Sequence, residues 1–334
     1  MKIVYVVEDL GIAGGVKVIV EHAEGLAARG HDVSIVTKGP PPEWIRVGVP
    51  IVRVTEFSAA TLPRADVHVG TWYTTVVPTV EARRAERVFH FSQGYEAIYP
   101  HVAAHKGEID RAYLQEIPKL LISEHLVGLF EGTFPGPFHV VPQAIRATDY
   151  APHDPKRARA RRPQAVGVVG PFEGLNKGIR VALSALGRLR AEGRRFFLHR
   201  ASQTALSEEE LSYGPCDLYV KGASVARMAD WYRGLDLLVH PSFEAEGFPL
   251  PPLEAMAAGV PVVLTAIPSF DPIPRDAASW VPPGDDAAMA LETARLLDDE
   301  TLWASRRARG FEVAATFSLE KALDALEKAF QKTS

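Results

Sequence analysis

Short runs of apolar, often β-branched residues alternate along this chain with longer stretches in which apolar residues have helical spacing. The alternation predicts parallel sheets with helices on both faces, because each parallel strand needs a crossover connection to the next. The strand candidates of the first half are Ile3–Val7, Val33–Thr37, Ile51–Thr55, Val67–Gly70, Val88–Ser92, Leu120–Ser123 and His139–Val141. A second series follows, with candidates Ala165–Val169, Phe196–His199, Leu218–Val220, Leu237–His240 and Val262–Leu264.

The repeated pattern predicts two doubly wound, Rossmann-like α/β domains, and 334 residues suffice for both. The Pro-bounded, apolar-poor stretch 151–163 is predicted to be a linker. We therefore expect domains over 1–150 and 164–311 and a C-terminal helix within 312–334, with Ser318 as its N-cap. Ligands of open α/β sheets bind beyond the carboxyl ends of the strands, so a cleft between two facing domains is the expected site.

Charge and cysteine content narrow the class of protein. The 37 basic and 41 acidic residues give a net charge of −4, which disfavours wholesale nucleic-acid binding. The lone Cys216 cannot form an intrachain disulfide or a cysteine zinc cluster, and this favours a reducing, cytoplasmic compartment. The apolar start of the chain is too short for a signal-peptide core, and no run approaches the roughly 18 apolar residues of a membrane span.

The segment from His240 to Leu264 places two glutamates, Glu246 and Glu254, eight residues apart across a predicted loop-to-helix junction. Pro251 and Pro252 predict the helix start, and Gly259 followed by Pro261 predicts its end. Amide groups of a helix N-terminus favour a phosphate, while carboxylates beside it accept hydrogen bonds from hydroxyls. Taken singly, either glutamate is as well explained as a solvated acid, Glu254 being favoured by the helix dipole.

The whole segment resembles the EGFGLPxLEAMAxGxPV signature of family 4 retaining glycosyltransferases of the GT-B fold. In that family the two glutamates of an E-x7-E element bracket the donor, and here they are Glu246 and Glu254. The resemblance implies that amides of Gly247, Phe248 and Leu250 contact the donor diphosphate. Pro249 replaces the second glycine of the signature and removes one amide. The fold also implies that the C-terminal helix packs back on the first domain.

The first domain opens with glycines between a strand and a helix, at Gly11, Gly14 and Gly15. Their spacing does not fit the dinucleotide fingerprint G-x-G-x-x-G, and a tight strand-to-helix turn explains them equally well. The family has a glycine pair at this place that approaches the donor, and Gly14 and Gly15 match it.

The second domain opens with a strand, a loop and Lys177-Gly178 before an amphipathic helix. A lysine at a helix start opposes the dipole and suggests an anion, although an exposed lysine there costs only tenths of a kcal/mol. The family pattern has an arginine and then a lysine-glycine pair, both cations binding the donor diphosphate. Lys177-Gly178 matches the second element, whereas Pro171 stands in place of the arginine.

Aromatic residues at expected strand ends of the first domain suit a sugar or lipid acceptor, although core packing also explains them. They are Trp72, Tyr73 and Tyr95. Many family members have a cleft histidine at this strand end. Gln93 takes that position here, with His90 as the alternative, and Gln93-Gly-Tyr95-Glu96 resembles a segment of some polysaccharide rhamnosyltransferases.

These observations predict a retaining transferase that moves a sugar from a nucleoside diphosphate to a hydroxyl acceptor, with Glu246, Lys177 and Gln93 as its catalytic residues. No metal-ligand spacing is present and no cofactor is expected, so Lys177 and backbone amides would neutralise the leaving diphosphate. An NDP-sugar epimerase of the same fold and a noncatalytic sugar-nucleotide binder are the alternatives. The basic run Lys156–Arg162 is either a solvated linker or a contact with an anionic membrane.

Overall fold

The computed structural model describes residues 1–99, 102–154, 163–243, 247–248 and 250–331. The chain divides into two compact units. The first consists of Met1–Ala144 together with helix α12 (Leu319–Gln331), and the second is Ile145–Ser318. The chain therefore passes from one unit to the other twice, after residue 144 and again after residue 318.

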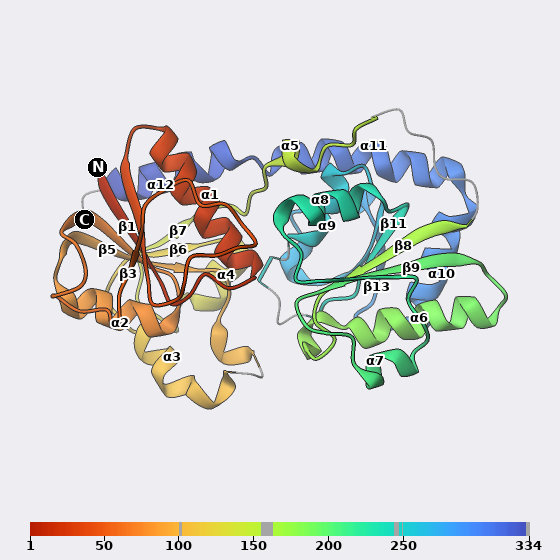
Figure 1. The fold of residues 1–334 in the computed structure, drawn as a ribbon, viewed down its shortest axis with the longest axis horizontal. Helices are drawn as coiled ribbons and strands as arrows, with labels where there is room; N and C mark the ends of the chain where they lie inside the picture. Colours follow the sequence, from red (N-terminus) through yellow and green to blue (C-terminus); the bar gives the residue numbers. More distant parts are fainter. Residues whose placement is uncertain (100–101, 155–162, 244–246, 249, 332–334) are drawn as a thin grey trace. The chain divides into compact units, whose positions relative to one another are not determined.

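The first unit is built on a seven-stranded sheet of order β3-β2-β1-β4-β5-β6-β7, in which every neighbouring pair is parallel (Figure 1). β1 lies near the centre and is buried along almost its whole length, because helices cover both of its faces. The strands are β1 (Lys2–Val7), β2 (Asp32–Thr37), β3 (Ile51–Arg53), β4 (Ala65–Gly70), β5 (Ala85–Ser92), β6 (Lys119–Leu121) and β7 (Phe138–Val140).

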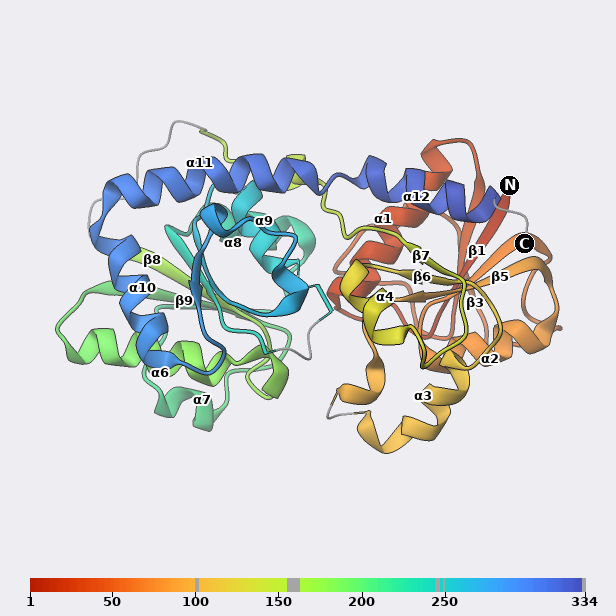
Figure 2. The same ribbon diagram turned by 180° about the vertical axis from the view of Figure 1, so that it is seen from behind.

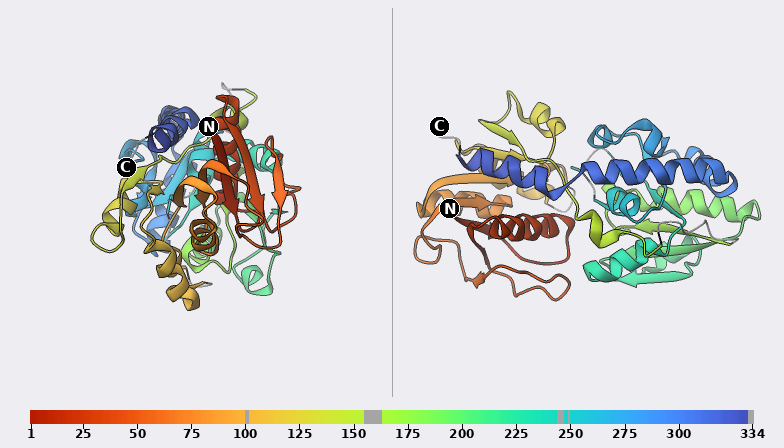
Figure 3. Two further views of the ribbon diagram at one scale, coloured as in Figure 1. Left: turned by 90° about the vertical axis from the view of Figure 1, so that its left-hand side faces the viewer. Right: turned by 90° about the horizontal axis from the view of Figure 1, so that it is seen from above.

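Helices α1 (Gly14–Ala28) and α12 pack side by side against this sheet, as Figures 2 and 3 show. Gly25 permits the close approach, since a Cβ there would lie 2.6 Å from Leu323 Cδ1. Arg29 Nη1 donates to Asp324 Oδ1 and to Glu327 Oε2, each at 2.7 Å. The other helices are α2 (Tyr73–Ala82), α3 (Lys106–Tyr113), α4 (Glu124–Phe130) and the short 3-10 turns Glu96–Ile98 and Ala103–His105.

The second unit is built on a six-stranded parallel sheet of order β10-β9-β8-β11-β12-β13. Its strands are β8 (Gln164–Val169), β9 (Phe196–Ser202), β10 (Leu218–Lys221), β11 (Leu237–His240), β12 (Val262–Thr265) and β13 (Ser279–Val281). Its helices are α5 (Ala147–Tyr150), α6 (Ile179–Ala191), α7 (Glu208–Ser212), α8 (Val225–Arg233), α9 (Pro251–Ala257), α10 (Asp286–Asp298) and α11 (Glu300–Thr316). Single 3-10 turns lie at Leu175–Lys177, Pro268–Phe270 and Arg275–Ala277.

The two parallel α/β sheets were predicted from the strand pattern, but several boundaries differ. The units change over after residue 144, earlier than the predicted limit at 150, because α5 packs on α8 and α9 of the second unit. The predicted C-terminal helix after Ser318 is α12, which begins at Leu319, whereas the apolar residues just before it belong to the end of α11. Most of the predicted linker, with its basic run, lies outside the described residues. Among the helices of the described residues, none is long and apolar enough to cross a membrane.

Candidate functional site

The loop after β8 packs directly against the chain that follows β11. Gly178 has φ +62°, and a Cβ there would collide with the carbonyl oxygen of Pro241. The amide of Phe243 donates to the carbonyl of Asn176 at 2.9 Å. The second sheet thus brings Lys177-Gly178 to the chain between β11 and the E-x7-E segment, at the carboxyl edge where open α/β sheets bind ligands. Lys177 ends a 3-10 turn, so it lies two residues before α6 rather than in the helix itself.

A buried histidine lies beside this contact. His240, the last residue of β11, is 1% exposed, and its Nε2 is 2.9 Å from Ser242 Oγ. Thr265 at the end of β12 donates its hydroxyl to the carbonyl of Ser242. Burial, reinforced by the nearby charge of Lys177, lowers the pKa of His240 to about 3. The imidazole is therefore neutral at physiological pH and acts with Thr265 as a fixed support for the 241–243 chain.

Glu254 lies on α9, which begins at Pro251 as predicted and is followed by Gly259 with φ +74°. The Glu254 side chain is buried, and Tyr150 Oη donates to its Oε1 at 2.7 Å. Burial, followed by the charge of Glu254, raises the pKa of Tyr232. Glu246 and Pro249 lie outside the described residues, whereas Gly247, Phe248 and Leu250 are buried. The Phe248 ring packs 5.4 Å from that of Phe317.

The loop at Pro171 has no arginine, but a buried guanidinium lies beneath it. Arg200 on β9 is 1% exposed and donates to the carbonyls of Val168 and Gly170 at 2.7 and 3.1 Å. Its Nε donates to Glu210 Oε1 at 2.6 Å. The Arg200 guanidinium is therefore bonded to carbonyls at the end of β8 and to a carboxylate, and it holds the backbone of the loop that follows β8 in place.

In the first unit, Gly14 and Gly15 form the first turn of α1 rather than a loop before it. Gln93, which directly follows β5, donates from Nε2 to the carbonyl of Gly15 at 3.0 Å. A Cβ on Gly15 would lie 2.9 Å from that nitrogen, so the glycine makes room for the amide. The structure therefore brings together the glycine pair and Gln93, which the sequence predicted separately.

His90 is placed in the core. It is fully buried, neither ring nitrogen has a partner among the described residues, and burial lowers its pKa to about 3. A buried polar network lies next to it, in which Tyr113 Oη donates to Glu96 Oε2 and lies 2.8 Å from Ser92 Oγ. Burial raises the pKa of Glu96 to about 7. Of the two candidates at this strand end, Gln93 reaches α1 and His90 does not.

The predicted acceptor residues lie in two groups. Trp72 and Tyr73 adjoin at the start of α2 with ring centroids 5.5 Å apart, and Tyr73 is 8% exposed. Burial, with the charges of nearby glutamates, raises the pKa of Tyr73. Tyr95 packs edge-on against Tyr113 and donates to Asp110. Trp72 and Tyr95 are half-buried, so part of each ring remains accessible.

Sequence reasoning missed a polar cluster at the same edge of the first sheet. Glu8 follows β1 and pairs with Lys38, which follows β2, at 3.1 Å. Thr74 donates to the same carboxylate at 2.6 Å. Polar residues directly after neighbouring strands were the available signal, because parallel strands bring their carboxyl ends to one edge. No such signal exists for Tyr150 or Arg200, whose partners are distant in sequence.

Residues 163–299 match the family described as glycosyl transferases group 1. The second unit contains a glycosyltransferase group 1 domain. A stretch of 138 residues is 32% identical to the lipopolysaccharide core biosynthesis mannosyltransferase LpsB of Rhizobium meliloti (strain 1021). That match covers 40% of this chain and 39% of LpsB, so the chain spans about two-fifths of that relative.

Solved structures place the group 1 domain and the first unit in the GT-B fold. A sucrose-phosphate synthase from Thermosynechococcus elongatus is similar over 99% of this chain and 98% of its own, with TM-score 0.81 and 17% identity. The Anabaena protein Alr3699/HepE, solved with UDP-glucose, is similar over 98% and 99%, with TM-score 0.79 and 13% identity. At these identities the similarity concerns the fold.

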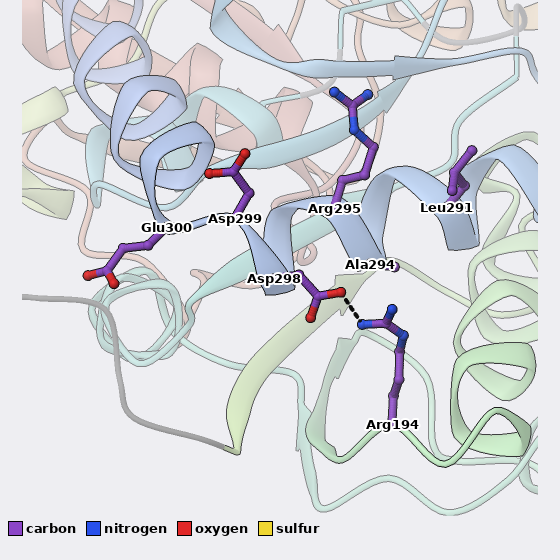
Figure 4. A pocket seen from close by; sticks show the side chains of 7 residues that line it. All are labelled: Arg194, Leu291, Ala294, Arg295, Asp298, Asp299 and Glu300. Carbon is purple, nitrogen blue, oxygen red and sulfur yellow. Dashed lines mark hydrogen bonds and ion pairs between the residues drawn. The ribbon is translucent and has the colours of Figure 1, made fainter.

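A surface pocket of about 560 Å³ lies elsewhere on the group 1 domain, around the end of α10 (Figure 4). Arg194, which precedes β9, pairs there with Asp298 at 2.6 Å. Because Arg194 precedes its strand, this pocket is at the amino edge of the sheet, opposite the carboxyl edge that carries Lys177. None of the residues predicted to form the site lines it. Among the described residues, no group of three or more His, Cys, Asp or Glu side chains is arranged to hold a metal ion.

Proposed function

We propose that this protein is a retaining glycosyltransferase that moves a sugar from a nucleoside diphosphate to a hydroxyl acceptor, in the synthesis of a glycan or lipopolysaccharide. The observation that carries the proposal is the contact of the Lys177-Gly178 loop with Pro241 and Phe243 in the group 1 domain. It brings a lysine to residues 241–243, which precede the E-x7-E segment in the chain. The structure of Alr3699/HepE with UDP-glucose supports a nucleotide-sugar donor, and the name of LpsB supports a glycan product.

Cleavage of a nucleotide-sugar donor requires a positive charge beside the departing diphosphate. When the bond between the anomeric carbon and the phosphate oxygen breaks, its electron pair stays on the diphosphate, whose negative charge grows. In this proposal the Lys177 ammonium and the amides of Gly247, Phe248 and Leu250 stabilise that charge. Glu246 stabilises the positive charge at the anomeric carbon, and Glu254 accepts hydrogen bonds from the ribose hydroxyls.

The transfer itself needs no further reactant. The acceptor hydroxyl oxygen forms the new bond to the anomeric carbon on the face that the phosphate leaves, and its proton passes to the leaving phosphate oxygen. The products are the glycoside, with its anomeric configuration retained, and the nucleoside diphosphate. Gly14, Gly15 and Gln93 are proposed as further contacts of the donor, and Trp72, Tyr73 and Tyr95 as contacts of the acceptor.

The donor is tested first, by thermal shift with UDP, GDP, ADP and dTDP. A ligand that binds only the folded protein raises the melting temperature by mass action, so one nucleotide is expected to give the largest shift. The NDP-sugars of that base are then tried with sugar and lipid acceptors, and the product is identified by mass spectrometry. Consumption of donor without acceptor would favour an epimerase, and binding without turnover a noncatalytic binder.

The residues are tested with Lys177→Ala and Glu246→Gln. Each is expected to lower the transfer rate about 100-fold or more, the usual effect of removing one preorganised electrostatic contact. Arg195→Ala is the matched control, because it removes an exposed cation that precedes β9, at the amino edge of the same sheet. Transfer that survives both site substitutions would refute the mechanism. A separate vesicle-pelleting assay with anionic lipid tests the predicted membrane contact of the basic run.

A further inference from the structure

The contact between Tyr150 and Glu254 joins the E-x7-E segment to a residue that was not predicted from the sequence to form the site. Tyr150 is the last residue of α5, is 1% exposed, and donates from its hydroxyl to Glu254 Oε1 at 2.7 Å. The Glu254 side chain is itself 7% exposed. A carboxylate that is withdrawn from water in this way is stabilised by a hydrogen bond to its charged form.

Helix α5 is held firmly enough to act as a reference point. Arg233 on α8 donates from Nε to the carbonyl of Ala151 at 2.9 Å and from Nη2 to the carbonyl of Asp149. The ring of Tyr150 packs edge-on against that of Tyr232, with centroids 5.9 Å apart. Upstream, the amide of Ile145 donates to the carbonyl of Phe317 at 3.0 Å. Backbone and ring contacts on both sides therefore fix where the Tyr150 hydroxyl points.

A tyrosine hydroxyl has one proton to donate, whereas an ionised carboxylate offers about four acceptor positions on its two oxygens. The bond from Tyr150 therefore orients Glu254 at one of these positions, and the nearby Tyr232 hydroxyl also interacts with the carboxylate. We propose that ligand hydroxyls use the other acceptor positions. Because rotation of the carboxyl group would break a buried hydrogen bond, Glu254 presents one geometry to a ligand.

We propose that Tyr150 is a positioning residue that fixes Glu254 for recognition of the donor ribose, and so contributes to the choice of ribonucleotides over 2′-deoxyribonucleotides. This inference rests on the proposed function, since it assigns the Glu254 carboxylate to a nucleotide. It adds that the short helix following the first crossing between the units belongs to the donor site.

The experiment compares Tyr150→Phe with the wild type by calorimetric titration of UDP, GDP, ADP and their 2′-deoxy counterparts. For the base that the wild type selects, Tyr150→Phe is expected to weaken ribonucleotide binding about 10-fold, the effect of one hydrogen bond to a charged group. Binding of the 2′-deoxy nucleotide is expected to weaken less, about threefold or under, because only its 3′ hydroxyl is left to contact Glu254. The preference for ribose therefore falls, which general loosening of the fold would not produce.

Tyr213→Phe is the matched control, because it removes a tyrosine hydroxyl from the same unit, where the Tyr213 ring packs 5.9 Å from Phe172. It should leave both affinities unchanged. If Tyr150→Phe melts below the assay temperature, Arg233→Lys is used instead. That variant keeps the Tyr150 hydroxyl but loosens α5, and it should lower the ribose preference in the same direction.

An unchanged ribose preference in the folded variant, or selection of dTDP by the wild type, overturns the inference. Neither result touches the proposed transferase activity, which is measured separately as product formed by the wild type. Conversely, a wild type that binds none of these nucleotides refutes the proposed function itself.

Discussion

The first βα connection is built differently in the two units, although both follow the first strand of a parallel sheet. In the first unit, Gly15 lies in a regular helical turn and makes room for a side chain, the amide of Gln93. In the second unit, Gly178 has a left-handed backbone and makes room for main chain, the carbonyl of Pro241. A side chain can move away from an added methyl group, whereas a backbone carbonyl directly after a buried strand cannot do so easily.

The strand-end carbonyls show the same contrast. At the end of β1, the hydroxyls of Thr71 and Thr37 donate to the carbonyls of Val6 and Glu8 at 3.0 and 3.3 Å. At the end of β8, the guanidinium of Arg200 makes the equivalent bonds while paired with buried Glu210. We infer that the loop carrying Lys177 is rigid and intolerant of substitution, and that the glycine pair of α1 is adjustable.

The strongest test of this contrast is Gly178→Ala. We expect it to lower the free energy of unfolding by about 4 kcal/mol or more, because left-handed strain adds to the collision with Pro241. Gly193→Ala is the control, since Gly193 also has a left-handed backbone, φ +81°, but has open space around the position of a Cβ. It should cost only about 1 to 2 kcal/mol. Urea unfolding measures both, and equal losses would contradict the role given to Pro241.

Arg200→Met is expected to cost about 3 to 5 kcal/mol, because it leaves Glu210 buried without its cation. Its counterpart in the first unit, Thr71→Val, removes one neutral hydrogen bond and should cost about 1 kcal/mol. Hydrogen exchange followed by mass spectrometry would assign each loss to its own unit. Similar losses of unfolding free energy for the two substitutions would show that Arg200 and Thr71 support their strand-end carbonyls equally.

Glu96 gives the first unit a dependence on pH. Its pKa is raised to about 7 by burial, above the ordinary 4.5, so the folded state holds the proton more tightly than the unfolded state. Stability from this group is complete below pH 4.5 and declines as the pH rises to 7, by about 3 kcal/mol at 1.36 kcal/mol per pKa unit. Glu96→Gln should abolish this part of the decline, as measured by urea unfolding at pH 5 and pH 8. A parallel decline in the variant would assign it to other groups.

The smallest effect is expected for Gly15→Ala. The gain in helix propensity, up to about 1 kcal/mol, should be offset by displacement of the Gln93 amide, so that stability changes little. Gly107→Ala is a close control, because Gly107 is likewise the second residue of its helix, α3, and has open space where a Cβ would lie. It should be stabilising. In a Gln93→Ala background, Gly15→Ala should also be stabilising, because no amide is left to displace. Thermal melts measure this, and an unchanged or lower melting temperature would contradict the role given to Gln93.

The sequence predicted the parts of this molecule that depend on local pattern. Strands buried on both faces leave continuous apolar runs, and Gly259, with φ +74°, follows the end of α9 as predicted. β13, with the sequence Ser-Trp-Val, holds a single β-branched residue after a polar start and so leaves no such run, and that strand was missed. Gly14 and Gly15 were expected in a loop because glycine lowers helix propensity, yet they begin α1.

Contacts between distant segments could not be predicted from the local sequence pattern. Nothing near Tyr150 in the chain indicates that it bonds to Glu254, and nothing near Arg200 indicates the carbonyls that it holds. The pairing of Gln93 with Gly15 depends on the strand order, which brings the end of β5 close to the start of α1. The sequence thus predicted which residue types to examine, and the fold supplied their partners.

Helix α12 has a consequence for the order of folding. It completes the first unit but is synthesised after the whole of the second, because Ile145–Ser318 is inserted between α12 and the sheet it covers. Domains ordinarily fold in the order in which they leave the ribosome. Here the seven strands of the first unit are made first, but the contiguous second unit is complete earlier, because the face of α1 that meets Leu323 stays uncovered until α12 emerges. We therefore expect the first unit, which contains the N-terminus, to complete its folding after the second.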